Sequence, residues 1–168
     1  PWAGHRSHFL RPAATLVRVP DDVDQLDASF AHIASFPLLG VRKLKLEIGE
    51  SAMVIGMGIL GLFAAQIARL SGAIPIIVSD MSPERRELAL KLGCDHALTP
   101  ADGDIADRVK DLTEGKGVDS IVEVTGKSLA LQQALECVAD QGRISLLGCT
   151  RISDTPIDFY QYVHRRGV

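Results

Sequence analysis

The segment Gly56-Met57-Gly58-Ile59-Leu60-Gly61 carries three glycines in the spacing G-x-G-x-x-G, between a short apolar run and a helical pattern. Gly56 permits a sharp turn from strand to helix, Gly58 lets an anion approach the backbone because it lacks a Cβ, and Gly61 lets the helix pack closely on the strands. The N–H groups and the positive dipole end of the helix then face the anion. The segment therefore predicts a binding site for a diphosphate.

The surroundings of this turn favour a dinucleotide site over a plain packing turn. A strand precedes it, an apolar helix follows it, and Asp80 ends the next strand, 19 positions after Gly61. Asp80 can accept hydrogen bonds from the hydroxyls of an adenosine ribose, each worth about 1.5–3 kcal/mol because the acceptor is charged. A 2′-phosphate about 5 Å away would be repelled by about 3 kcal/mol per unit charge at an effective dielectric constant of about 20. We therefore expect NAD rather than NADP.

Two arginines on the helix after Asp80 leave an alternative open. Arg85 and Arg86 could each turn toward a phosphate, which would weaken the preference for NAD. They could equally be exposed helix charges beside Glu84 and Glu87. We include Arg85 among the candidate cofactor-binding residues.

From about residue 50 onward, short β-branched runs alternate with helical patterns, which is typical of βαβ units and a parallel sheet. The fold class that we expect is α/β, a Rossmann-type doubly wound parallel sheet with helices on both faces. The expected strands are Ala52–Ile55, Ile74–Ser79, His96–Leu98, Ser120–Val124 and Arg143–Leu147. Pro75 must sit at the very start of its strand because it cannot donate to a ladder. The expected helices are Ile59–Leu70, one from the Ser82 cap to Gly93, one with Ile105, Val109 and Leu112 that closes at Gly115, and one with the apolar face Leu131, Ala134, Leu135 and Val138.

Two further glycine turns follow the fourth and fifth expected strands, Val124-Thr125-Gly126 and Leu147-Gly148-Cys149. Ligands of open α/β sheets lie outside the carboxyl ends of the strands, so these turns should border the nicotinamide half, although each could also be an ordinary turn. The candidate cofactor-binding residues are Gly56, Gly58, Ile59, Leu60, Gly61, Asp80, Arg85, Val124, Thr125, Gly126, Leu147 and Gly148.

The first 45 residues differ from the rest. Ala14–Val19 is predicted to be an isolated strand, followed by a solvated loop and by a helical stretch, Leu26–Leu44, with a break or restart at Pro37. An orphan strand has no sheet of its own to join, so it is assigned to a neighbouring domain that is missing. Because the chain begins with Pro1 rather than Met, we expect it to be a piece of a longer protein.

Composition excludes several classes of protein. The 168 residues fit about one domain, and 46% hydrophobic with 23% charged residues argues against disorder. No apolar run reaches the roughly 18 residues of a membrane span, and a net charge of −3 gives no long-range attraction to nucleic acid. Three widely spaced cysteines favour a reduced, cytoplasmic protein without disulfides.

No catalytic or metal-binding set is predicted within this chain. The five histidines are scattered, and the only tight grouping, Cys94-Asp95-His96, offers two potential ligands where zinc needs three or four. No G-x-S-x-G, H-E-x-x-H or P-loop lysine pattern occurs.

The chain resembles the zinc-type medium-chain dehydrogenases/reductases, which include alcohol, sorbitol and threonine dehydrogenases. The resemblance covers nearly the whole chain. The matching segments are Gly49–Leu62, Ala65–Ala68, Gly72-Ala73, Asp80, Arg85, Ala89, Leu92–Asp95, Val118-Asp119, Glu123–Gly126 and Gly142–Gly148. Gly4–Phe9 resembles the last strand region of the family's GroES-like catalytic domain, with His8 in place of the usual Glu.

The resemblance implies that the parent enzyme moves hydride between a secondary alcohol or polyol and nicotinamide, with zinc polarising the oxygen. It assigns residues 1–24 to a remnant of the catalytic domain and residues 25–168 to the NAD-binding domain. The family's zinc ligands mostly lie upstream of Pro1, so zinc is expected only in the full-length parent. Tyr160–Val168 resembles the lead into a sixth strand that is absent here, which leaves a five-stranded sheet with an exposed edge and a possible homo-oligomer.

Two alternatives remain. A methyltransferase that uses S-adenosylmethionine also has a Gly-rich turn, but such enzymes commonly carry an acidic residue in the first strand, and Ala52–Ile55 has none. A non-catalytic module that senses NAD would bind the same cofactor, so the motif cannot separate it from an enzyme.

Overall fold

A computed structural model describes residues 6–148 and 155–168, and the chain divides into two compact units, 1–32 and 33–168. In the first unit, a short 3-10 helix (Ala13–Thr15) precedes helix α1 (Gln25–Ser29), whose cap residue Asp24 accepts a hydrogen bond from the Leu26 amide. The strand predicted at Ala14–Val19 is wrong. The described part of this unit offers no neighbouring strand to pair with, and the Thr15 hydroxyl instead closes a local turn onto the Pro12 carbonyl.

Helix α2 (Ala31–Leu44) follows α1 after a break at Phe30. The break predicted at Pro37 is therefore wrong, because Pro37 lies inside α2. A proline within a helix costs about 3 kcal/mol, since it lacks an N–H and crowds the preceding turn. Burial of Pro37 together with Val41 and Leu44 offsets that cost.

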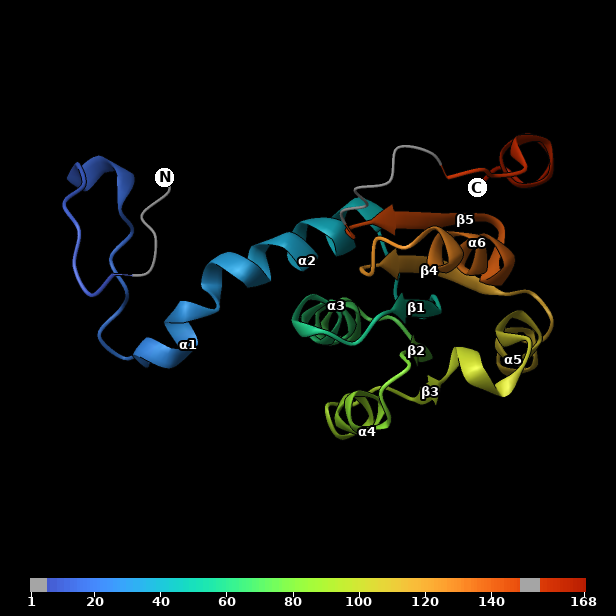
Figure 1. Cartoon of the computed structure of the whole chain (residues 1–168), viewed down its shortest axis with the longest axis horizontal. Helices are drawn as coiled ribbons and strands as arrows, with labels where there is room; N and C mark the ends of the chain where they lie inside the picture. Colours follow the sequence, from blue (N-terminus) through green and yellow to red (C-terminus); the bar gives the residue numbers. More distant parts are fainter. Residues whose placement is uncertain (1–5, 149–154) are drawn as a thin grey trace. The chain divides into compact units, whose positions relative to one another are not determined.

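Five parallel strands form one sheet in the order β3-β2-β1-β4-β5 (Figure 1). Their bounds are Ala52–Ile55 for β1, Ile76–Ser79 for β2, His96–Leu98 for β3, Val118–Glu123 for β4 and Val138–Leu146 for β5. The chain first builds outward from β1 through β2 and β3, then returns to the other side of β1 with β4. This reversal is the point where open α/β sheets bind ligands. The predicted fold class is confirmed.

Helices cover both faces of the sheet. The helices after α2 are α3 (Ile59–Leu70), α4 (Pro83–Lys91), α5 (Ile105–Leu112) and α6 (Ser128–Cys137), with a 3-10 turn at Pro100–Asp102. One core cluster joins residues of α2, α3 and α4 to the sheet, and a second joins residues of α5 and α6 to it. The doubly wound arrangement thus follows from apolar residues on both faces of each strand.

Strand boundaries differ from the sequence prediction at three places. β2 begins at Ile76, after Pro75, whose carbonyl accepts a hydrogen bond from Ala52. β4 begins two residues earlier than predicted and ends at Glu123. β5 begins at Val138, which was predicted to belong to a helix face. The pairing of β4 with β5 is irregular, and Gln141 has a φ of 62°. The first half of β5 therefore lacks the residue pattern of a regular strand.

The last described segment contacts the start of β5. A π-helix (Tyr160–Arg165) is followed by Arg166, whose guanidinium donates to Asp140 at 2.7 Å and to the carbonyls of Leu135 and Val138. β5 lies at the edge of the sheet, and among the described residues no sixth strand pairs with it.

We predict that Ser120→Ala raises the free energy of unfolding by about 1 kcal/mol, because the fully buried Ser120 hydroxyl in β4 finds no partner in the described chain. Ser51→Ala is the matched control. The Ser51 hydroxyl donates to Asp119 at 2.7 Å and accepts from its amide, so its loss should lower stability by about 1 kcal/mol. Urea denaturation of both variants measures this, and a destabilised Ser120→Ala protein would contradict the prediction.

Candidate functional site

The Gly-rich turn between β1 and α3 is closed on one side by protein and open on the other. Gly56 has a φ of +99°, and a Cβ there would lie 2.7 Å from Thr125 Cγ2. A Cβ at Gly61 would overlap the Gly56 carbonyl oxygen. At Gly58, by contrast, no atom lies within 4 Å of an added Cβ. Packing therefore requires glycine at positions 56 and 61, whereas Gly58 borders open space.

The open side of the turn faces the N-terminus of α3. Gly58 is the cap residue and supplies no side-chain acceptor, and the first turn contains no acidic residue. The first amides of the helix, including those of Ile59 and Leu60, therefore retain the partial positive charge of a helix N-terminus. This arrangement can receive an anion.

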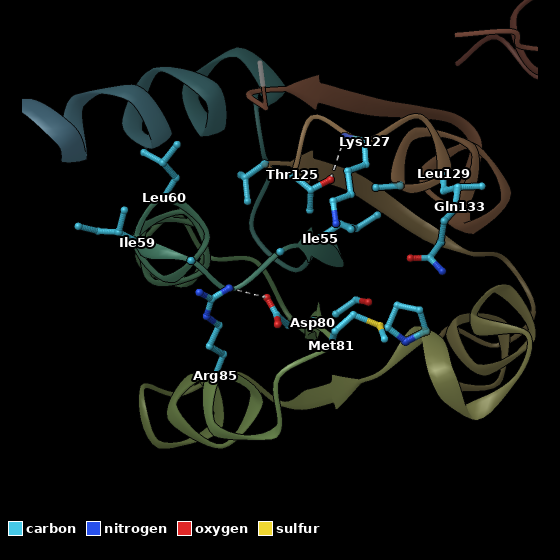
Figure 2. A pocket seen from close by; sticks show the side chains of 16 residues that line it. Ile55, Ile59, Leu60, Asp80, Met81, Arg85, Thr125, Lys127, Leu129 and Gln133 are labelled. Atoms are coloured by element: carbon cyan, nitrogen blue, oxygen red, sulfur yellow. Dashed lines mark hydrogen bonds and ion pairs between the residues drawn. The ribbon is translucent and has the colours of Figure 1, made fainter. Parts of the chain in front are cut away.

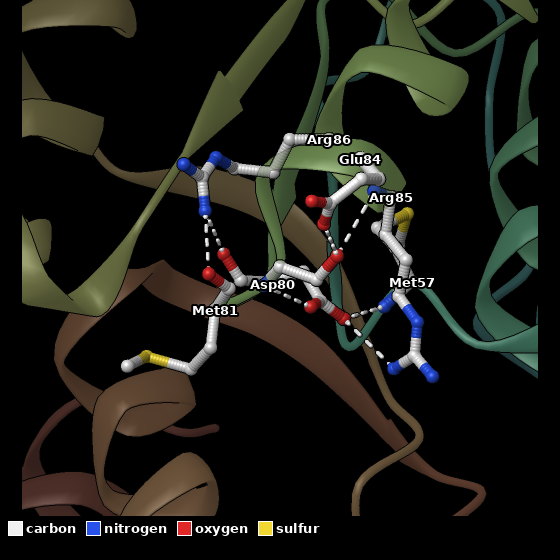
Figure 3. Close-up of polar contacts among 7 residues, drawn as sticks. Met57, Asp80, Met81, Glu84, Arg85 and Arg86 are labelled. Atoms are coloured by element: carbon white, nitrogen blue, oxygen red, sulfur yellow. Dashed lines mark hydrogen bonds and ion pairs between the residues drawn. The ribbon is translucent and has the colours of Figure 1, made fainter.

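Asp80 follows β2 and reaches back to the turn (Figure 3). Its Oδ2 accepts from the Met57 amide at 2.6 Å, and its Oδ1 accepts from the Ser82 amide at 2.8 Å. The side chain is 10% exposed. Each oxygen of an ionised carboxylate has two acceptor positions, so both oxygens keep capacity for one more donor. The sequence pointed to Asp80 as a ribose acceptor, but the hydrogen bond that fixes it to Met57 was not foreseen.

The two arginines of α4 differ in their contacts. Arg86 Nη1 donates to the carbonyls of Asp80 and Met81, at 2.7 and 3.0 Å (Figure 3). Arg85 is 58% exposed, and its Nη1 lies 3.8 Å from Asp80 Oδ2. Arg86 is therefore held by the backbone, and Arg85 is the arginine that lies beside Asp80 at the site.

A buried acid shapes the turns after β4 and β5. Glu123 is only 2% exposed. Its Oε1 accepts hydrogen bonds from the Thr125 amide, at 2.6 Å, and from the Thr125 hydroxyl. The Glu123 carbonyl accepts from the amides of Leu147 and Gly148, at 2.8 and 2.9 Å. A Cβ at Gly148 would overlap the Gly126 amide. Glu123 thus holds the two turns against each other.

A cavity of about 690 Å³ lies at the carboxyl ends of the strands (Figure 2). Its lining residues are Ile55, Gly56, Gly58, Ile59, Leu60, Ser79, Asp80, Met81, Arg85, Pro100, Val124, Thr125, Lys127, Leu129, Ala130 and Gln133. Eight of the predicted residues are brought together here. Gly61 and Gly126 shape the neighbouring turns without lining the cavity, and Leu147 and Gly148 also lie outside its lining. Leu147 instead packs against the core cluster of α2 and α3.

Several lining residues were not foreseen, and those from α6 are the most informative. Lys127 follows the predicted Gly126 turn directly, and Ala130 and Gln133 follow it at helical spacing of three, which places the three residues on one helix face. The apolar periodicity of α6 indicated its core face only. The sequence signal for the face toward the cavity was the polar character of Lys127 and Gln133.

Neither of the two described cysteines, Cys94 and Cys137, lines this cavity. Burial raises the pKa of Cys94 to about 11 and that of Cys137 to about 12, so both remain protonated at neutral pH. Cys149 lies outside the described residues. Across residues 6–148 and 155–168, no group of three or more His, Cys, Asp or Glu side chains could hold a metal ion.

Comparison with known proteins identifies the family of the chain. Residues 60–167 match the family model described as zinc-binding dehydrogenase, and the chain belongs to that family. It is similar to L-threonine 3-dehydrogenase of Pyrococcus horikoshii, with 46% identity over 60% of this chain and 29% of the relative. It is also similar to sorbitol dehydrogenase of Bacillus subtilis, with 31% identity over 83% of this chain and 40% of the relative.

Two solved structures extend the comparison. Alcohol dehydrogenase TADH from Thermus sp. ATN1 superposes with a TM-score of 0.85 and 30% identity, over 90% of this chain and 44% of that one. A protein described as a zinc-binding dehydrogenase from Sinorhizobium meliloti 1021, bound to NADP, has a TM-score of 0.83 and 24% identity over 89% and 44%. The chain spans less than half the length of each of these four proteins. Within the part that the structure describes, no helix is both long and apolar enough to cross a membrane.

We predict that the stability of the fold depends on glycine at position 61 and not on glycine at position 58. Gly61→Ala should lower the free energy of unfolding by about 2–3 kcal/mol, because the new methyl group overlaps a backbone carbonyl. Gly58→Ala should change it by less than about 1 kcal/mol, since the φ of −74° suits alanine and the space is open. Thermal or urea unfolding of the two variants measures the difference, and equal losses would contradict this account of the turn.

Proposed function

We propose that this chain is the cofactor-binding part of a zinc-dependent alcohol or polyol dehydrogenase, and that its cavity holds the adenosine half of NAD. The observation that carries the proposal is the open space at Gly58, which lies between an uncapped helix N-terminus and the Asp80 carboxylate. Membership of the zinc-binding dehydrogenase family supports it. That membership also removes the methyltransferase alternative.

Each predicted residue has a role in this proposal. The amides of Ile59 and Leu60 bind the diphosphate, and the free acceptor positions of Asp80 bind the ribose hydroxyls. Val124 and Thr125 border the cavity from the β4 side. Leu147 and Gly148 are proposed to lie toward the nicotinamide half, beyond the adenosine cavity. When bound, NAD accepts or donates a hydride at its nicotinamide ring.

Asp80 supports a preference for NAD over NADP. A 2′-phosphate at the ribose would lie next to a carboxylate that is 10% exposed and poorly screened by water. Arg85 is positioned to offset part of that repulsion, whereas Arg86 is occupied by backbone carbonyls. One similar structure holds NADP, but at 24% identity to this chain it shows a similarity of fold and does not identify the cofactor of this chain.

Zinc does not fit the described residues, because they contain no group of three potential ligands. We therefore assign no metal role to any of them. We propose that zinc ligands and alcohol contacts come from a catalytic domain of a longer protein, to which residues 1–24 belong, while residues 25–168 bind the cofactor. A non-catalytic NAD sensor would use the same cavity, and only a test of turnover by the longer protein separates the two.

We predict that NADH binds about tenfold more tightly than NADPH. Asp80→Asn should weaken NADH binding about tenfold and reduce the ratio of the two affinities, because the charged acceptor is lost. Isothermal titration calorimetry measures both affinities. Asp95→Asn is the matched control: its Oδ2 also accepts from a backbone amide, that of Ile76 at 2.6 Å, but Asp95 does not line the cavity. Equal or tighter NADPH binding by the unaltered chain would refute the role given to Asp80.

We further predict that the 168-residue chain binds NAD(H) and yet does not oxidise alcohols. The reason is that its described residues contain no group of three His, Cys, Asp or Glu side chains to hold a metal ion that would polarise the alcohol oxygen. A spectrophotometric assay of NADH formation with secondary alcohols and polyols, with and without added zinc, checks this. A robust rate that depends on zinc would contradict the proposal that zinc and the alcohol are bound by a separate catalytic domain.

A further inference from the structure

The wall of the cavity formed by α6 carries a polar side chain with no hydrogen-bond partner among the described residues. Gln133 projects from α6 into the cavity, across from Met81 (Figure 2). The side chain is half-buried, and its amide has no hydrogen-bond partner in the described parts of the chain. Its carbonyl oxygen and its NH2 group are therefore both available to a ligand.

The surroundings of Gln133 suit a flat aromatic base. Ile55, Pro100 and Leu129 contribute apolar surface to the same cavity. Ser79 is only 1% exposed and also lines this cavity, and its hydroxyl has no hydrogen-bond partner in the described chain. An apolar slot with a small number of convergent polar groups is the usual form of a site that orients one ligand.

The proposed position of the ribose places the base next to Gln133. Asp80 and Met81 are consecutive residues at the end of β2, and Figure 2 shows Gln133 across the cavity from Met81. With its diphosphate at the turn and its ribose at Asp80, a nucleotide can only extend its base away from the turn. Figure 2 shows Leu129 and Gln133 on the side of the cavity away from Ile59 and Leu60 of the turn.

We propose that Gln133 recognises the polar edge of adenine and makes the cavity selective for adenine dinucleotides; this inference rests on the proposed function. The amide oxygen accepts a hydrogen bond from the 6-amino group, and the amide NH2 donates to N7. A glutamine presents this acceptor and donor side by side, which matches the 6-amino/N7 edge of adenine. Hypoxanthine presents two acceptors at the same edge, so a glutamine makes only one of the two hydrogen bonds with it.

The test compares reduced NAD with reduced nicotinamide hypoxanthine dinucleotide, which differ only at the base. By calorimetry, the unaltered chain should bind the adenine dinucleotide about tenfold more tightly, in keeping with the discrimination that a bidentate amide contact provides. In Gln133→Leu this ratio should fall close to one, through weaker binding of the adenine dinucleotide. Gln133→Met removes the same polar atoms and serves if the leucine variant does not fold.

Gln132→Leu is the matched control, because Gln132 is a half-buried glutamine of the same helix that does not line the cavity. It should keep the tenfold ratio. A ratio near one in the unaltered chain, or an undiminished ratio in both Gln133 variants, would overturn the assignment of Gln133 while leaving the proposed function intact. Failure of the unaltered chain to bind either dinucleotide would instead refute the proposed function and this inference with it.

Discussion

The hydrogen bond from the Met57 amide to the Asp80 carboxylate, 2.6 Å long, joins the two segments on which the site depends. Met57 belongs to the turn that presents the helix N-terminus, and Asp80 ends the neighbouring strand. A hydrogen bond to a charged acceptor contributes about 1.5–3 kcal/mol, and its contribution is largest where water is mostly excluded. Asp80 therefore fixes the turn before any ligand arrives, and the ligand meets a preformed arrangement of amides and acceptor.

Two acids stand at the ends of the strands on either side of β1, and their surroundings separate their roles. Glu123 is almost fully buried, and its carboxylate accepts hydrogen bonds from the Thr125 amide, the Thr125 hydroxyl and the Gly126 amide. It holds the turns after β4 and β5 in place. Asp80 accepts only two backbone hydrogen bonds and borders the cavity. We propose that Asp80 binds the ribose because it lines the cavity and keeps an acceptor position on each oxygen, whereas Glu123 does not line the cavity.

The sequence was informative where structure depends on near neighbours along the chain. The turn after β1, the Ser82 cap of α4 and the closure of α5 near Gly115 each rest on a few adjacent residues, and all three are confirmed. Ala14–Val19 and Pro37 failed because their outcome depends on whether a partner strand or a buried surface is available, which no local pattern states. Gln133 was missed for a related reason, since one glutamine on a helix face gives no periodic signal.

The proposal that the cavity holds the adenosine half of the cofactor has a consequence for the energetics of hydride transfer. Contacts with the adenosine half of a cofactor are distant from the atom that exchanges hydride, and they are the same before and during that step. Interactions that do not change between ground state and transition state set affinity and leave the chemical barrier unaltered. The roles that we propose for Asp80 and Gln133 therefore concern which dinucleotide is held. In the dehydrogenase that we propose, groups at the nicotinamide end and at the alcohol site govern the rate of hydride transfer, and these groups lie outside the adenosine cavity.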